Sequence, residues 1–236
     1  MRAEARHRLK EDRFAIATQE TIHWTVEHRN KLVLSAVIVG AVLALVLGGW
    51  YYLRHQDQAA SIAMGEALRT YRAPIVSAGS PPEPGMTSFP SAQERAKAAQ
   101  VQFRNIAAKY SHTRNGEIAR YFAALTDNDL GNTAAAEKEL KEISDAHNAD
   151  LASLAKFALA SQYKSSGQDA KAIDLYKQLI AHPSRTVGKA EAQLELASLY
   201  AAKQPAEAKK MYEEISKENP ASAAAQIAQA KMQDLK

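Results

Sequence analysis

Cysteine is absent from the 236-residue sequence, and its absence excludes several classes of protein. Without a thiol there is no cysteine nucleophile, no disulfide framework, no thiolate metal site and no lipid-modified cysteine anchor. The sequence also lacks a G-x-S-x-G elbow, a phosphate-binding loop and a dinucleotide fingerprint. We therefore expect a protein that is not an enzyme and needs no cofactor.

Metal-binding and nucleic-acid-binding patterns are missing as well. None of the seven histidines lies four residues from another, the spacing that places two zinc ligands on one helical face. The formal net charge of +4 is spread evenly, with +2 in residues 1–53 and +2 in the remainder. Because nucleic acids need a concentrated basic face, this distribution argues against them. We expect no metal, no nucleic acid and no small-molecule substrate.

One long apolar run, residues 32–53, dominates what the sequence does contain. It has no charge and no proline, and as a helix it is about 33 Å long, enough to cross a hydrocarbon core of about 30 Å. Trp50, Tyr51 and Tyr52 stand at its end, where aromatic rings favour the membrane interface. The run starts late and ends without a small-x-small site, so we interpret it as an uncleaved transmembrane helix. A buried core helix is the alternative.

The short segment before the span, residues 1–31, carries seven basic residues and predicts that the N-terminus is cytoplasmic. Phe14, Ala17, Thr21 and Trp24 share one narrow helical face in it. This pattern predicts an amphipathic tail on the cytoplasmic membrane surface. A solvated tail that only sets the topology is the alternative.

Small residues recur at every fourth position of the span. They form a shallow ridge that would let another membrane helix approach closely. The general abundance of small residues in membrane helices is the alternative explanation. The candidates for packing against a partner helix are Ala36, Gly40, Ala44 and Gly48.

The segment after the span divides into a helix and a loop. Residues 54–73 keep an apolar stripe at helical spacing and predict a juxtamembrane helix, which Pro74 stops. Residues 74–90 hold five of the eight prolines, so we predict an extended linker there. Ser91 and Glu94 then resemble a capping box at a helix start.

Residues 91–236 have no strand signal and repeat themselves. A set of three residues recurs four times: a small residue, a large apolar residue four positions later, and a second large residue three positions after that. Successive sets begin 37, 36 and 36 residues apart. Such a repeat indicates one helical face used several times. The four sets are Ala99, Phe103 and Ile106; Ala136, Leu140 and Ile143; Ala172, Tyr176 and Leu179; and Ala208, Tyr212 and Ile215.

These residues resemble the tetratricopeptide repeat, best in the third repeat, where Tyr163 and Gly167 also match the motif. The second repeat departs from it, because Asp127 stands where a large aromatic residue is expected and Ala124 replaces a glycine. The first repeat shows only its second helix, and residues 54–71 are a candidate for the first. We predict an all-α fold: one N-terminal transmembrane helix, then a tetratricopeptide-like helical-hairpin solenoid ending in a capping helix.

A solenoid of this kind is curved, and its first helices line the concave side. If the resemblance holds, Tyr121, Phe157 and Leu194 occupy equivalent positions facing this groove. They are candidates for binding peptides or unfolded proteins. The alternative is that they only pack within the stack.

The whole arrangement resembles the ancillary SecYEG translocon subunit family of bacteria. The resemblance rests on the tail, anchor and repeat order, on His55-Gln56 leading into an Ala/Ser-rich helix, and on the repeats themselves. It implies a protein of the bacterial inner membrane with its repeat domain in the periplasm. The implied partners are the translocon or another envelope membrane protein, chaperones, unfolded clients and the lipid bilayer.

Two other functions remain open. The chain could be a structural adaptor subunit of an envelope machine for division or secretion, holding one fixed partner. With reversed topology it could be an adaptor that faces the cytosol.

Overall fold

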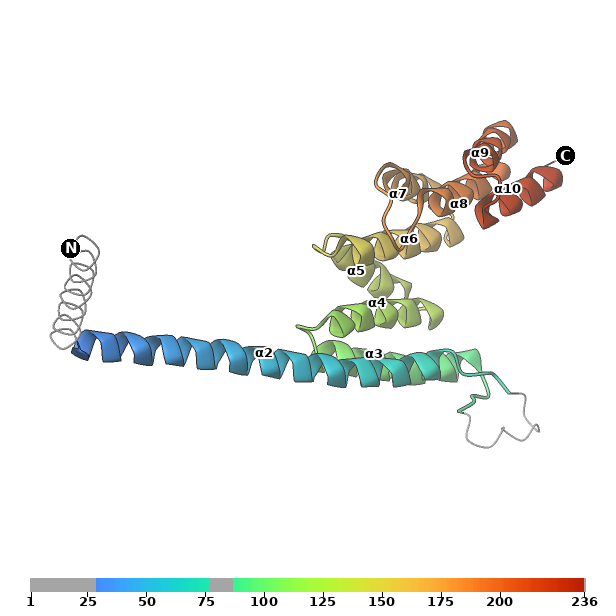
Figure 1. Ribbon diagram of the computed structural model, residues 1–236. Helices are drawn as coiled ribbons and strands as arrows, with labels where there is room; N and C mark the ends of the chain where they lie inside the picture. Colours follow the sequence, from blue (N-terminus) through green and yellow to red (C-terminus); the bar gives the residue numbers. More distant parts are fainter. Residues whose placement is uncertain (1–28, 77–86, 236) are drawn as a thin grey trace, which may run out of the picture. The chain divides into compact units, whose positions relative to one another are not determined.

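The computed structural model describes residues 29–76 and 87–235 (Figure 1). The predicted amphipathic tail, except for its last three residues, lies outside the described residues. The described helices are α2 (Arg29–Tyr71), α3 (Ala92–Lys109), α4 (Arg114–Asp129), α5 (Thr133–Ser144), α6 (Ala149–Ser165), α7 (Asp169–Ala181), α8 (Lys189–Ala201), α9 (Pro205–Glu218) and α10 (Ala223–Asp234).

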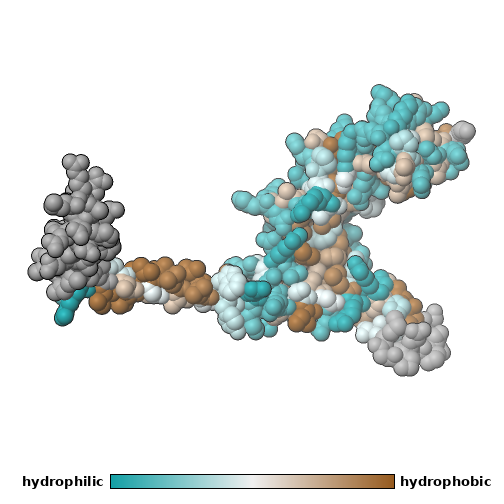
Figure 2. Space-filling model, viewed as in Figure 1, coloured by the Kyte–Doolittle hydropathy of each residue, from teal (hydrophilic) through white to brown (hydrophobic). Residues whose placement is uncertain are grey.

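The chain divides into two compact units, residues 1–55 and residues 56–236, and the boundary lies within α2. In the described part of the first unit, large apolar side chains are exposed, including Leu45 at 76% and Leu47 at 62%. Figure 2 shows them as a continuous hydrophobic surface. By length and composition, α2 is the one helix in the described ranges that could cross a membrane.

From α3 onward the second unit is a stack of antiparallel helices joined by short connections, which confirms the predicted helical-hairpin solenoid. The repeated sequence positions form its core, because the second helix of each hairpin turns them toward its neighbours. Phe103, Leu140, Tyr176 and Tyr212 are each at most 1% exposed. The small residue one turn earlier is always a fully buried alanine, which lets a neighbouring helix pass closely.

The first helix of repeat one is the C-terminal part of α2. Ala60, Met64 and Ala67 are buried in one apolar cluster with residues of α3 and α4, including Phe103. Sequence periodicity could not decide whether this helix belongs to repeat one, because a long insertion separates it from α3. The packing shows that the solenoid begins at about residue 56.

The insertion between these two helices is held together at its base. Ile75 and Phe89 form an isolated parallel bridge, with the Val76 amide donating to the Phe89 carbonyl at 2.9 Å. The Phe89 amide donates to the Pro74 carbonyl at 3.0 Å. The segment predicted as a linker thus leaves and rejoins the solenoid at one place, so α2 and α3 can pair despite it.

Local sequence signals account for several helix boundaries. The Ser91 hydroxyl accepts a hydrogen bond from the Glu94 amide at 3.1 Å, as expected from the capping box. Gly131 and Gly167, in the turns after α4 and α6, have φ of +82° and +73°. Side chains disfavour this left-handed backbone, so glycine allows the tight turn between the helices of a hairpin.

Gly116, in the first turn of α4, should not tolerate alanine. A Cβ atom there would lie 2.0 Å from the Tyr110 carbonyl oxygen, so the backbone of the α3–α4 connection would have to move. We expect Gly116→Ala to lower the free energy of unfolding by about 1 to 3 kcal/mol. Urea unfolding followed by circular dichroism measures this loss. Gly65→Ala, which has free space around its Cβ, is the control and should not destabilise the protein.

Candidate protein-binding surface

The three residues predicted to face the groove lie on successive first helices of the solenoid. Tyr121 lies on α4, Phe157 on α6 and Leu194 on α8, and each is half-buried. Tyr121 and Phe157 pack against the central apolar cluster, and Leu194 packs against the cluster at the C-terminal end. Each side chain therefore packs on the core and still leaves part of its surface accessible.

Phe157 shows how one of these side chains is positioned. Its ring meets the buried ring of Tyr176 edge-on, with centroids 5.8 Å apart and planes at 71°. Such a contact is a favoured geometry for aromatic pairs and fixes the ring without covering it entirely. Ile118, Leu154 and Ala158 are also partly buried on the same cluster. The first helices α4 and α6 thus carry an apolar row rather than isolated residues.

An ion pair links two first helices. Lys164 on α6 has its Nζ atom 2.8 Å from the Glu195 carboxylate and 2.5 Å from the Ser198 hydroxyl, both on α8. Sequence reasoning missed this link, because the residues are 31 and 34 positions apart and no local pattern connects them. The link positions α6 against α8.

An aromatic group joins repeat one to repeat two. Phe103 and Phe122 are stacked, with ring centroids 5.1 Å apart, and Tyr71 meets both rings edge-on at about 6 Å. Tyr121 meets Phe122 at 5.5 Å. The Tyr71 hydroxyl donates to the Asp129 carboxylate at 3.2 Å. Tyr121, a predicted groove position, is therefore connected to the end of α2 through packed rings.

The surroundings of Tyr121 give the protein a defined alkaline response. Burial, with a smaller contribution from Tyr71, raises the pKa of Tyr121 to about 12 from its ordinary value of 10.0. A raised pKa favours the neutral phenol in the folded state, so its contribution is complete below pH 10 and is lost as the pH rises from 10 towards 12. By pH 12 the free energy of unfolding of the unsubstituted protein should have fallen by about 2 kcal/mol more than that of the Tyr121→Phe variant.

Urea unfolding of both proteins at a series of pH values measures this difference. Equal losses between pH 10 and 12 would show that Tyr121 ionises as freely in the folded chain as in the unfolded chain.

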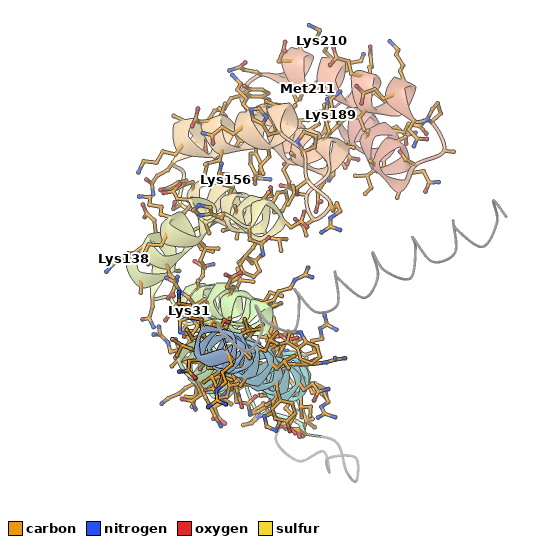
Figure 3. All side chains as sticks on the ribbon, turned by 60° about the vertical axis from the view of Figure 1, so that its left-hand side comes forward. Lys31, Lys138, Lys156, Lys189, Lys210 and Met211 are labelled. Carbon is orange, nitrogen blue, oxygen red and sulfur yellow. The ribbon has the colours of Figure 1, made fainter. Side chains whose placement is uncertain are left out.

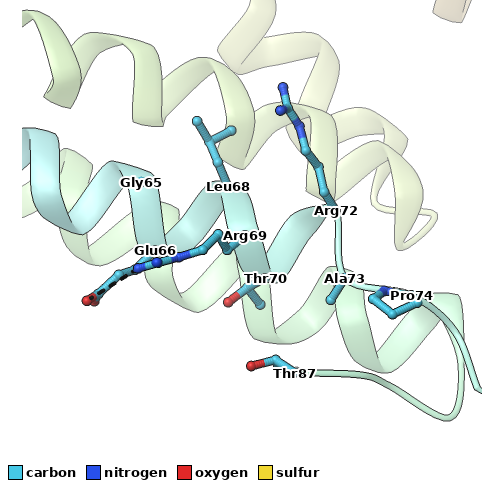
Figure 4. Close-up of a pocket in the computed structure, with 9 residues that line it drawn as sticks. All are labelled: Gly65, Glu66, Leu68, Arg69, Thr70, Arg72, Ala73, Pro74 and Thr87. Atoms are coloured by element: carbon cyan, nitrogen blue, oxygen red, sulfur yellow. Dashed lines mark ion pairs between the residues drawn. The ribbon is translucent and has the colours of Figure 1, made fainter. Parts of the chain in front are cut away.

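Two clefts in the described part of the chain do not collect reactive groups. A cleft of about 740 Å³ lies at the end of α2, where Arg69 extends along the helix to Glu66 at 3.8 Å (Figure 4). Arg72 points to the other side, so the two guanidinium groups do not converge. A second cleft, about 690 Å³, lies over Leu159 and Tyr163 on the side of the second helices α5 and α7.

Histidines show a pattern that sequence reasoning treated as scattered. His112, His147 and His182 are each exposed and lie in the connections that precede α4, α6 and α8. Their spacing of 35 residues is close to the repeat offsets of 36 and 37. Within the described residues, no group of three or more histidine or acidic side chains could hold a metal ion.

The small residues of the apolar run remain a prediction. Ala36, Gly40, Ala44 and Gly48 lie in one helix and are exposed. A Cβ atom at Gly40 or Gly48 would meet nothing within 4 Å. The described chain therefore leaves room for another helix along this ridge.

A family model described as "Tetratricopeptide repeat-like domain" matches residues 23–236, which include the apolar run. No curated protein matches the chain. Among solved structures, a crystal structure of a variant Podosopora anserina protein described as a kinesin light chain with nearly identical TPR-like repeats is similar, with a TM-score of 0.56 at 16% identity. The match covers 77% of this chain and 86% of that chain, and at this identity it shows the fold alone.

Proposed function

The chain belongs to the tetratricopeptide repeat-like domain family, and we propose that it is a membrane-anchored, non-catalytic scaffold that binds unfolded or translocating proteins beside the Sec translocon. The observation that carries the proposal is the apolar row on the first helices. Repeat solenoids bind extended partners on their concave side, which the first helices are predicted to line. Tyr121 and Phe157 offer partly accessible aromatic surface, the kind that anchors protein interfaces.

The apolar run supports the anchored part of the proposal. The family match begins before residue 32 and continues to the C-terminus, so one family model covers the run and the repeats together. We propose that α2 crosses the bacterial inner membrane through residues 32–53. The N-terminus would then be cytoplasmic and the repeats periplasmic, with chaperones and translocating proteins as partners.

Photo-crosslinking tests the binding function. A photoreactive phenylalanine analogue replaces Phe157 in one variant and Lys138 in the control. Lys138 is exposed on α5, a second helix, and lies on the outer side of the arc of helices in Figure 3. We expect many secretory proteins to be captured from position 157 and few from position 138. Equal capture from both positions would contradict binding by the apolar row.

The same experiment distinguishes this function from the alternative, a structural adaptor. A structural adaptor subunit of an envelope machine would give one discrete crosslinked band from position 157 instead of many. The family match is compatible with both functions, because tetratricopeptide-like repeats generally bind proteins.

Labelling of single cysteines tests the orientation of the chain in the membrane, and it is simple because the natural sequence has no cysteine. Ser166→Cys in the repeats and Ala3→Cys in the tail each create a single thiol. In spheroplasts, a membrane-impermeant maleimide should label position 166 and spare position 3. The opposite result would place the repeats in the cytosol and favour the cytosolic adaptor.

A further inference from the structure

Repeats two and three differ in how they satisfy one basic side chain of the first helix. In repeat two, Arg120 on α4 donates from Nε to the Glu139 carboxylate at 2.9 Å and from Nη2 to the Glu142 carboxylate at 2.7 Å. Both glutamates lie on α5, the second helix of the same repeat. Hydrogen bonds between ionised groups are the stronger ones in proteins. Repeat two therefore balances this cation within a single hairpin.

Repeat three keeps the cation and loses both acids. The offset of 36 residues between these repeats carries Arg120 to Lys156 on α6. The same offset replaces the two glutamates by Leu175 and Gln178 on α7, and neither side chain can neutralise an ammonium group. Lys156 takes part in none of the described ion pairs. Repeat four has the neutral Gln193 at this position, so the unmatched cation belongs to repeat three.

Lys156 is half-buried and lines the cleft of about 690 Å³ described above. Leu159 and Leu175 line the same cleft, so the ammonium group lies beside apolar surface. Partial burial of a charge costs free energy unless an opposite charge or a hydrogen-bond acceptor replaces the lost water. A ligand that brings a carboxylate together with an apolar group would meet both needs.

Four other charged side chains line this cleft: Lys141, Lys171, Asp145 and Asp174. The two lysines are already engaged, because Lys141 donates to the Glu137 carboxylate at 2.6 Å and the Lys171 Nζ atom lies 4.8 Å from the centre of the Tyr163 ring. Both aspartates are exposed and would repel further acidic groups. The cleft therefore suits one carboxylate at Lys156 rather than a run of acidic residues.

We propose that this cleft binds a segment of a partner protein in which a single aspartate or glutamate is flanked by apolar side chains. The partner's carboxylate pairs with Lys156, as Glu142 pairs with Arg120 in repeat two. Its apolar neighbours lie over Leu159 and Leu175. None of the residues that line the cleft belongs to the apolar row of the first helices, so this is a second binding surface.

The test selects peptides on the full chain purified in a mild detergent. A displayed library of random short peptides is enriched on the unsubstituted protein and, in parallel, on Lys156→Gln. We expect the unsubstituted protein to select about threefold more peptides in which one acidic residue stands next to leucine, isoleucine or phenylalanine. Lys138→Gln, at an exposed position of α5, is the matched control and should select the same peptides as the unsubstituted protein (Figure 3).

Fluorescence anisotropy then measures the selected peptide against its counterpart with an amide in place of the carboxylate. Loss of the carboxylate should weaken binding to the unsubstituted protein about tenfold, and should have little effect on binding to Lys156→Gln. Gln178→Glu places an internal carboxylate at the position of Glu142 and should pair with Lys156. This variant should weaken the acidic peptide about tenfold while its circular dichroism spectrum stays unchanged.

Three results would overturn the proposal. One is equal selection of acidic peptides by the unsubstituted protein and by Lys156→Gln. Another is selection of acidic runs instead of single acids, which would show long-range attraction alone. The third is loss of peptide binding in Leu194→Ala, which would assign the peptide to the predicted groove. Binding that depends on Lys156 and not on Leu194 would support the cleft whatever position 157 captures in the photo-crosslinking experiment.

Discussion

Removing the Gln56–Tyr71 segment is expected to destabilise the repeats more than any single substitution. Met64 and Ala67 would no longer cover Phe103, and Tyr71 would no longer pack edge-on against the stacked rings of α3 and α4. One large-to-small change in a core costs about 2 to 5 kcal/mol, and this deletion removes several such contacts. A chain that starts at residue 90 should therefore lose repeat one's cooperative unfolding and should aggregate, whereas one that starts at residue 56 should not.

Guanidinium unfolding followed by circular dichroism compares the two chains. Within the full-length protein, Met64→Ala should lower the free energy of unfolding by about 2 to 4 kcal/mol, because Met64 is 4% exposed. Ile62→Ala is the matched control on the same helix, since Ile62 is 69% exposed, and its effect should stay within about 0.5 kcal/mol. Equal effects of the two substitutions would show that α2 is not part of the solenoid.

The second large effect is expected at Asp127, the residue that departs from the repeat pattern. Its side chain is 2% exposed and accepts hydrogen bonds from Gln100 Nε2 at 2.6 Å and Arg104 Nη2 at 2.5 Å, both on α3. In place of an aromatic ring, repeat two thus uses a buried carboxylate that α3 satisfies. Asp127→Ala leaves these donors without their acceptor and should cost about 2 to 4 kcal/mol.

A double-mutant cycle measures the contribution of the ion pair. Arg104 is 52% exposed, so Arg104→Ala alone should cost less than Asp127→Ala, and the double variant should cost less than the sum. Asp145→Ala, at an exposed position, is the control and should change the free energy of unfolding by less than about 0.5 kcal/mol. Additive single effects would show that Arg104 and Asp127 are not coupled.

Sequence periodicity predicted the parts of the fold that depend on local pattern. The buried series that contains Phe103, Leu140, Tyr176 and Tyr212 could be recognised because every repeat needs the same face of its second helix. Ser91 could be recognised as a helix cap because its partner is three residues away. These signals lie within one or two helical turns, and spacing alone reveals them.

Other features depend on residues that are distant in sequence. Repeat one's first helix was hidden because the insertion at residues 74–90 breaks the repeat offset, and only the packing of Met64 near Phe103 reveals it. The link from Lys164 to Glu195 and the partners of Asp127 were missed because the residues that meet are far apart in the sequence. The groove positions are a prediction from the repeat, but only the structure shows that these residues are half-buried and that Phe157 packs on Tyr176.

The sequence by itself determined a helical solenoid after a long apolar run, because helical period, repeat spacing and run length are properties of the chain alone. Only the tertiary structure decided that α2 completes repeat one and that α3 satisfies a buried Asp127. Each of these depends on which helices meet. That pairing is set by the free energy of burying whole faces together, a quantity that no single segment carries.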